Sequence, residues 1–233
     1  MRELNSSNRL EEGHAPKDSE ESHQRHSGED RQQGHTVFPA AQGLYNPHYE
    51  RDACGIGFVV NIKGEQSHEI VRQALTVLLN LTHRGATGSE PNTGDGAGIL
   101  FQTPHKFLKK VTTELGFQLP EPGQYGVGMV FLPLETDDRL GCEKEFEAIV
   151  AAEGQAVLGW RTVPTSNATL GITSRTSEPV VRMVFISRSS DIKTDMDFER
   201  KLYVIRKQAE RKIRYNEESF SNQFYIASLS YKT

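Results

Sequence analysis

The chain changes character at residue 54, and this change limits which residues can build a folded core. Residues 1–36 contain thirteen charged residues and four of the eight histidines, but only four apolar residues. Such a segment buries too little apolar surface to offset the entropy lost on ordering, so we expect a disordered leader over 1–36. From Cys54 the chain reads Cys-Gly-Ile-Gly-Phe-Val-Val, an apolar run interrupted by glycine. The folded part is therefore expected to begin at Cys54.

Cys54 is also the first candidate for chemistry. Cleavage before it would place a free α-amine and a thiol on one residue, the pair by which N-terminal nucleophile enzymes attack and accept a proton. The ordinary pKa is about 7.7–8.0 for the amine and about 8.5 for a free thiol, both near working pH. We therefore predict that residues 1–36 and the aromatic, proline-bearing segment 37–53 form a propeptide. Cys54 would then be the nucleophile and its α-amine the base, whereas the alternative is a buried strand cysteine.

Two glycine-containing motifs follow Cys54. Leu-Thr-His-Arg-Gly-Ala occupies residues 81–86, and Asn-Thr-Gly-Asp-Gly-Ala-Gly-Ile-Leu occupies residues 92–100. The second motif lacks the lysine of a Walker loop and no dinucleotide fingerprint is present, so loop geometry explains its glycines better than a phosphate site. Taken alone, Arg84 is typical of a solvated side chain at a helix end, and Gly85 of the residue that stops the helix.

In this order the motifs resemble those of class II glutamine amidotransferases, which use an N-terminal cysteine, and in particular the start of glutamate synthase large subunits. Amidophosphoribosyltransferase and asparagine synthetase share the Cys-Gly start and the His-Arg-Gly turn, but they lack the glycine loop 92–98. Segments 198–203 and 224–230 also favour glutamate synthases, and the resemblance extends from about residue 43 to residue 233. It implies that Arg84 and Gly85 help to shape a substrate pocket beside Cys54.

The resemblance implies a glutaminase reaction. Cys54 would release ammonia from L-glutamine through a γ-glutamyl thioester, and the full-length enzyme would use that ammonia to make L-glutamate from 2-oxoglutarate. The full-length enzyme is then expected to hold FMN and an iron–sulfur cluster, with NADPH, NADH or ferredoxin as electron donor, and residues 1–233 to hold none of these. The implied partners are the rest of the glutamate synthase chain and either a small reductase subunit or ferredoxin.

Two motifs that glutamate synthases carry are absent from the sequence. One is a His-Gln-Arg-aromatic-Ser-Thr motif that holds the glutamine carboxylate, and the other is a His-Asn-Gly-Glu motif that forms the oxyanion hole. Loss of one oxyanion donor typically costs about 10²–10³ in rate. We therefore expect residues 54–233 to be a partial glutamine amidotransferase domain, an N-terminal fragment that alone is inactive and only marginally folded. A non-catalytic binding or regulatory module and another class II amidotransferase remain the alternatives.

Composition argues against several other classes of protein. The net charge is −4, and the basic residues between 201 and 214 are interleaved with glutamates, so no nucleic-acid surface is expected. No run approaches the roughly 18 apolar residues of a membrane span, and the leader resembles neither a secretory signal nor a transit peptide. A cytoplasmic location is expected, with an organelle left open. The second cysteine, Cys142, is expected to be incidental within a helix, and no Cys/His spacing indicates a metal site.

Hydrophobic periodicity predicts a mixture of helices and strands without regular alternation, which is typical of the α+β class. The resemblance implies the four-layer αββα sandwich of N-terminal nucleophile hydrolases, incomplete in this chain. The expected strands cover residues 58–62, 99–102, 125–132, 156–163, 179–187 and 224–229, and the expected helices cover residues 67–82, 105–115, 138–153 and 197–213.

Overall fold

A computed structural model describes residues 42–43, 55–85, 90, 92–214 and 223–233. Cys54 lies outside the described residues, as do residues 1–36 and most of the segment 37–53, so the expectations for the leader stay predictions. Contacts divide the chain into a unit Met1–Tyr49 and a unit Glu50–Thr233. Only Gln42 and Gly43 are described in the first unit, and the following description concerns the second.

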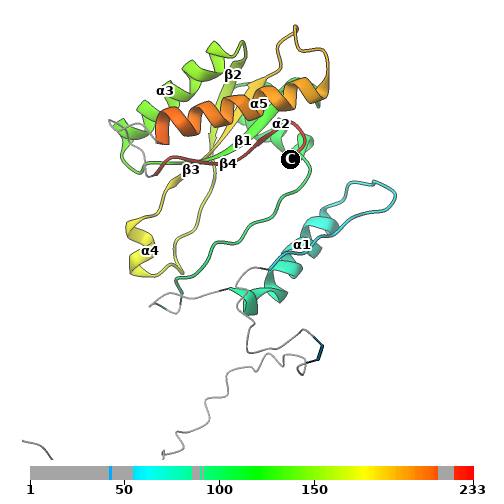
Figure 1. Cartoon of the computed structure of the whole chain (residues 1–233), viewed down its shortest axis with the longest axis vertical. Helices are drawn as coiled ribbons and strands as arrows, with labels where there is room; N and C mark the ends of the chain where they lie inside the picture. The colour runs from blue at the N-terminus through cyan, green and yellow to red at the C-terminus, as the bar shows by residue number, and fades with distance from the viewer. Residues whose placement is uncertain (1–41, 44–54, 86–89, 91, 215–222) are drawn as a thin grey trace, which may run out of the picture. The chain divides into compact units, whose positions relative to one another are not determined.

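A four-stranded antiparallel sheet forms the centre of this unit (Figure 1). The spatial order is β2-β3-β1-β4, so that β1 and β3 are paired on both sides. The register between the two central strands is unbroken from Tyr125 opposite Ser187 to Leu132 opposite Val180. The strands are β1 (Tyr125–Leu132), β2 (Ala156–Thr162), β3 (Val180–Ser187) and β4 (Tyr225–Ser230).

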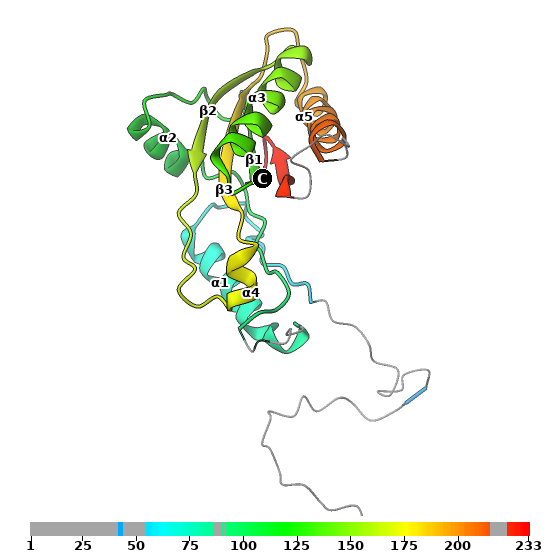
Figure 2. The ribbon, with the colours of Figure 1, turned by 90° about the vertical axis from the view of Figure 1, so that its left-hand side faces the viewer.

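Helices cover both faces of the sheet. Figure 2 shows α3 (Thr136–Ala152) and α5 (Asp195–Ala209) on one face and α2 (His105–Glu114) on the other. A π-helical turn, Glu210–Arg214, continues α5. The remaining helical segments are α1 (His68–Asn80), a 3₁₀ turn (Thr82–Arg84) and the short α4 (Ile172–Thr176). Helices packed on an antiparallel sheet confirm the α+β class.

Side-chain alternation along the strands separates two apolar clusters, because successive side chains of a strand point to opposite faces. The larger cluster lies between the sheet and helices α3 and α5, and it includes Val130, Val184 and Ile186. The smaller cluster includes Val127 and Phe185 and packs beneath α2. The helix predicted over residues 197–213 is present as α5 and its π-helical continuation, and α5 has an apolar stripe at helical spacing whose four members are all fully buried: Phe198, Leu202, Ile205 and Ala209.

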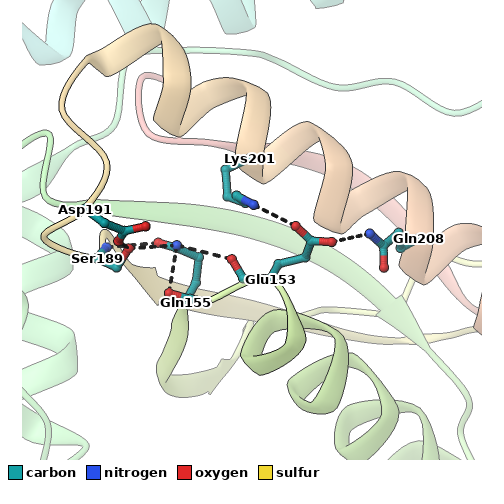
Figure 3. A network of polar contacts seen from close by, with 7 residues as sticks. Glu153, Gln155, Ser189, Asp191, Lys201 and Gln208 are labelled. Carbon is teal, nitrogen blue, oxygen red and sulfur yellow. Dashed lines mark hydrogen bonds and ion pairs between the residues drawn. The ribbon is translucent and has the colours of Figure 1, made fainter.

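A network of polar contacts joins the end of α3 to α5 and to the loop after β3 (Figure 3). The Glu153 carboxylate accepts hydrogen bonds from Lys201 Nζ at 2.8 Å and from Gln208 Nε2. The Lys201 hydrogen bond is the main reason why the pKa of Glu153 is lowered. The buried side chain of Gln155 donates to Ser189 Oγ at 3.0 Å and accepts from the Ser189 amide at 3.0 Å. These hydrogen bonds therefore link the end of α3 to α5 and to the loop after β3.

The basic residues of α5 and of the turn that follows it confirm the expected interleaving of charge. Acidic partners pair with them: Lys201 with Glu153, Arg206 and Lys207 with Glu210, and Lys212 with Glu145. This surface of the helix is therefore not uniformly positive.

Two of the predicted strands were wrong. Residues 58–62 and 99–102 carry no strand, and Phe58 and Ile62 are 87% and 99% exposed. A strand needs a partner for its backbone groups, and none of the described residues pairs with either segment. The described residues therefore contain one sheet rather than the two of the expected sandwich.

We expect the larger apolar cluster to dominate the stability of the fold. Phe146 of α3 is fully buried and lies edge-on to Trp160, with ring centroids 5.6 Å apart. Phe146→Ala should lower the free energy of unfolding by about 3–5 kcal/mol, since it removes buried surface and leaves a cavity. Urea denaturation measures this change.

Leu140→Ala is the matched control, because Leu140 lies on the same helix and is 54% exposed. Its cost should stay within about 0.5 kcal/mol. If both variants lowered the free energy of unfolding by the same amount, the larger cluster would not be the main source of stability in this unit.

Candidate functional site

The predicted site residues Arg84 and Gly85 lie in a tight turn beyond the end of α1. Leu81 caps the helix, and the chain then forms the 3₁₀ turn Thr82–Arg84. The Arg84 amide donates to the Leu81 carbonyl at 2.8 Å, and the Gly85 amide donates to the Thr82 carbonyl at 3.2 Å. These local bonds fix the direction in which the chain leaves the helix.

Gly85 ends the helical run, as expected. α1 ends at Asn80, the 3₁₀ turn Thr82–Arg84 continues the run, and Gly85 is the C-cap of that turn. Its φ of −85° and ψ of 146° belong to extended backbone, which other residues adopt readily. The stop at Gly85 therefore does not depend on the left-handed conformation that glycine often adopts at a helix end.

The glycines that follow Cys54 lie against α1 and the Arg84 turn. A Cβ atom on Gly55 would lie 3.0 Å from Leu81 Cδ2 and 3.2 Å from Arg84 Cβ, tighter than ordinary contact. A Cβ atom on Gly57 would overlap with Val77 Cγ1. Glycine in an apolar run often marks a place where another part of the molecule lies close to the backbone. Here helix α1 and the turn after it lie close to Gly55 and Gly57.

Cys54 itself lies outside the described residues. The catalytic role of Cys54 and the pocket roles of Arg84 and Gly85 stay predictions.

The glycine loop 92–98 does not have the geometry that we expected to explain its glycines. Neither Gly96 nor Gly98 has a positive φ, and a Cβ atom on either would meet nothing within 4 Å. Backbone conformation therefore gives no reason for glycine at these two positions.

A second contact begins five residues after Gly85 and was not anticipated from the sequence. The Glu90 carboxylate accepts hydrogen bonds from Thr93 Oγ1 at 2.8 Å and from the Thr173 amide at 3.3 Å. Asn92 Nδ2 donates to the Thr169 carbonyl at 3.0 Å. The bonds to Thr173 and Thr169 join positions about eighty residues apart, and sequence periodicity carries no information on such a pairing. They tie the start of the glycine loop to the segment that contains α4.

Cys142 is unsuited to act as a nucleophile. Its side chain is fully buried in α3 within the larger apolar cluster. Burial, with the nearby charges of Asp138 and Glu143, raises the pKa of its thiol to about 11. The expectation that Cys142 is incidental agrees with this environment.

The described residues include no group of three or more His, Cys, Asp or Glu side chains that could hold a metal ion. In the same part of the chain, no helix has the length and apolar character needed to cross a membrane. The described residues thus supply no ligand set for an iron–sulfur cluster.

Comparison with known proteins gives a family match that begins at the predicted nucleophile. The profile of the family described as "Glutamine amidotransferases class-II" matches residues 54–233. The chain is 51% identical over 196 residues to the Bacillus subtilis "Glutamate synthase [NADPH] large chain", a match that covers 84% of this chain and 12% of the relative.

Two further relatives have similar names. The Saccharomyces cerevisiae "Glutamate synthase [NADH]" is 41% identical over 206 residues, which cover 84% of this chain and 9% of the relative. The Arabidopsis thaliana "Ferredoxin-dependent glutamate synthase 2, chloroplastic" is 36% identical over 184 residues, which cover 79% of this chain and 11% of the relative. The chain therefore spans about a tenth of the length of these relatives.

The environment of Cys142 predicts slow reaction with thiol reagents. In a Cys54→Ser variant Cys142 is the remaining cysteine, and its rate with a disulfide reagent at pH 8 can be measured before and after unfolding in urea. The native rate should be at least about 10²-fold lower, because the raised pKa leaves correspondingly less thiolate and burial blocks access. A native rate equal to the unfolded rate would show that the thiol is accessible and ordinary.

Proposed function

The chain belongs to the class II glutamine amidotransferases, whose domain has the N-terminal nucleophile hydrolase fold, and from this premise we propose that it carries a glutaminase centre at Cys54. The observation that supports this most directly is that the family match starts at residue 54, the residue at which the sequence predicts the nucleophile. The close packing of Gly55 on Arg84 supports a pocket assembled at the same place.

The proposed reaction is hydrolysis of the side-chain amide of L-glutamine. The Cys54 thiolate attacks the amide carbonyl while the free α-amine of the same residue takes the thiol proton. The tetrahedral intermediate collapses to a γ-glutamyl thioester, and ammonia leaves with the proton returned by the amine. Water then attacks the thioester, which releases L-glutamate and restores the thiol.

We further propose that the protein to which this domain belongs is a glutamate synthase. The three relatives compared above all carry that name, which favours it over other class II amidotransferases. Ammonia, 2-oxoglutarate, two electrons and two protons would give L-glutamate and water. The partners would be the rest of the synthase chain and an electron donor, either through a small reductase subunit or as ferredoxin. We propose a cytoplasmic location and leave an organelle open.

FMN and an iron–sulfur cluster would supply the electron transfer of a full-length glutamate synthase. Hydrolysis of the glutamine amide changes no oxidation state, so the proposed glutaminase reaction needs neither group. The relatives name NADPH, NADH and ferredoxin, and the proposal does not select among these donors.

The nucleophile can be tested in the full-length enzyme. Cys54→Ser should reduce glutamine-dependent glutamate formation by at least about 10³-fold, because without the thiolate no thioester forms. Activity driven by free ammonia should persist, since ammonia bypasses this step. Both activities are measured by the oxidation of the electron donor.

Cys142→Ser is the matched control and should leave both activities within about twofold of wild type, because Cys142 lies in the core beneath α3. Glutamine-dependent turnover that survives Cys54→Ser would identify a different nucleophile.

The predicted propeptide has a separate test. N-terminal sequencing of the full-length enzyme purified from its host should start at Cys54, because an acylated nitrogen cannot accept the thiol proton. A fully active enzyme that starts at Met1 would eliminate the α-amine as the base.

A further inference from the structure

We propose that Glu90 is a positioning residue that holds the start of the glycine loop 92–98 against the segment 169–174 and thereby sets the affinity of the site for glutamine. This inference rests on the proposed glutaminase function. It assigns a role to a contact that is remote in sequence from Cys54.

The contact consists of a carboxylate surrounded by donors from two segments. Glu90 Oε2 accepts from Thr93 Oγ1 in its own loop and from the Thr173 amide in the distant segment. Thr93 Oγ1 lies 3.3 Å from Ser174 Oγ, a second polar link between the same segments. The side-chain Nδ2 of Asn92 donates a hydrogen bond to the Thr169 carbonyl. We call these residues, Glu90, Asn92, Thr93, Thr169, Thr173 and Ser174, the Glu90 clasp.

Gly171 shows how closely the two segments approach. A Cβ atom at this position would overlap with both Glu90 Oε2 and Thr93 Oγ1. The clasp therefore depends on glycine at 171, because any side chain there would push the carboxylate out of its hydrogen bonds.

The carboxylate is held in its charged form. The hydrogen bond from Thr93 is the main cause of the lowered pKa of Glu90, and donors from Thr173 add to it. A carboxyl group whose pKa is lower in the folded state gives its full stabilisation above its ordinary pKa. This stabilisation is lost as the pH falls through the lowered pKa. The clasp is thus intact at neutral pH.

Chain connectivity links the clasp to the Arg84 turn. Four residues separate Gly85 from Glu90, and an extended chain advances at most about 3.6 Å per residue, so the two Cα atoms lie within about 18 Å of each other. On the other side, Thr93 belongs to the glycine loop itself. Fixing Glu90 and Thr93 therefore limits how far the start of the loop can move from the segment 169–174, and the chain between Gly85 and Glu90 connects this contact to the Arg84 turn.

The test uses the full-length enzyme and compares glutamine-dependent with ammonia-dependent glutamate formation. Glu90→Ala should raise KM for glutamine about five- to tenfold, a typical effect of losing hydrogen bonds to a charged acceptor. Its ammonia-dependent kcat should stay within about twofold of wild type. Glu90→Gln keeps one acceptor oxygen and should recover part of the affinity.

A double variant tests whether Glu90 and Gly171 act through the same contact. Gly171→Ala alone should raise KM for glutamine as Glu90→Ala does, because its Cβ displaces the carboxylate. In Glu90→Ala/Gly171→Ala the methyl group occupies the space that the carboxylate has left. The double variant should therefore have about the KM of either single variant rather than the product of the two effects.

Glu178→Ala is the matched control. Glu178 is also a half-buried glutamate and accepts a hydrogen bond from Asn167 Nδ2 at 3.0 Å, which closes the same segment on itself without involving the glycine loop. Its KM for glutamine should equal that of wild type.

Three results would overturn the proposal. A wild-type KM in Glu90→Ala would show that the clasp does not affect glutamine binding. A parallel loss of ammonia-dependent activity, or a large fall in Tm, would show that Glu90 only supports the fold. If wild-type enzyme makes glutamate from ammonia but not from glutamine, the proposed glutaminase function fails, and the clasp proposal fails with it. This outcome is seen in the wild-type enzyme, whereas the first two are seen only in the variant.

Discussion

The side-chain alternation of β1 and β3 is the constraint on which the rest of the described structure depends. Because these strands are paired on both sides, their side chains are directed either to α3 and α5 or to α2. Val130 and Val184 anchor the larger cluster, and Val127 and Phe185 the smaller one. A shift of one residue in the register would exchange the two faces and disrupt the packing of both clusters. The helices, and the polar network of Glu153 and Gln155 that links their ends, follow from this arrangement.

The sequence predicted best those elements whose own residues carry the signal. β1 was predicted at its observed limits, and the buried stripe of α5 follows directly from helical spacing. Residues 58–62 and 99–102 failed because an apolar run indicates a strand only if another strand pairs with it, and pairing is not a local property. The short α4 has no apolar stripe that periodicity could detect. The family resemblance, by contrast, depends on ordered motifs and was confirmed over residues 54–233.

For the candidate site, the sequence predicted the residue types and the structure supplied the contacts between them. Gly55 and Gly57 pack closely against α1 and the Arg84 turn, where a Cβ atom on either glycine would be too near its neighbours. The Glu90 clasp could not be predicted, since its hydrogen bonds join residues that no motif connects. The first feature packs Gly55 and Gly57 on α1 and the Arg84 turn, and the second joins Glu90 and Asn92 to the segment that contains α4.

The central claim is that Cys54, with a free α-amine, is the residue that reacts with glutamine. A glutamine analogue with an electrophilic carbon in place of the side-chain amide tests it most directly, by mass spectrometry of the labelled full-length enzyme after proteolysis. We expect one label per chain, on the sulfur of an N-terminal peptide that starts at Cys54, and protection by excess L-glutamine. A label on Cys142, or a labelled Cys54 that still carries residues 1–53 in an enzyme active with glutamine, would contradict it.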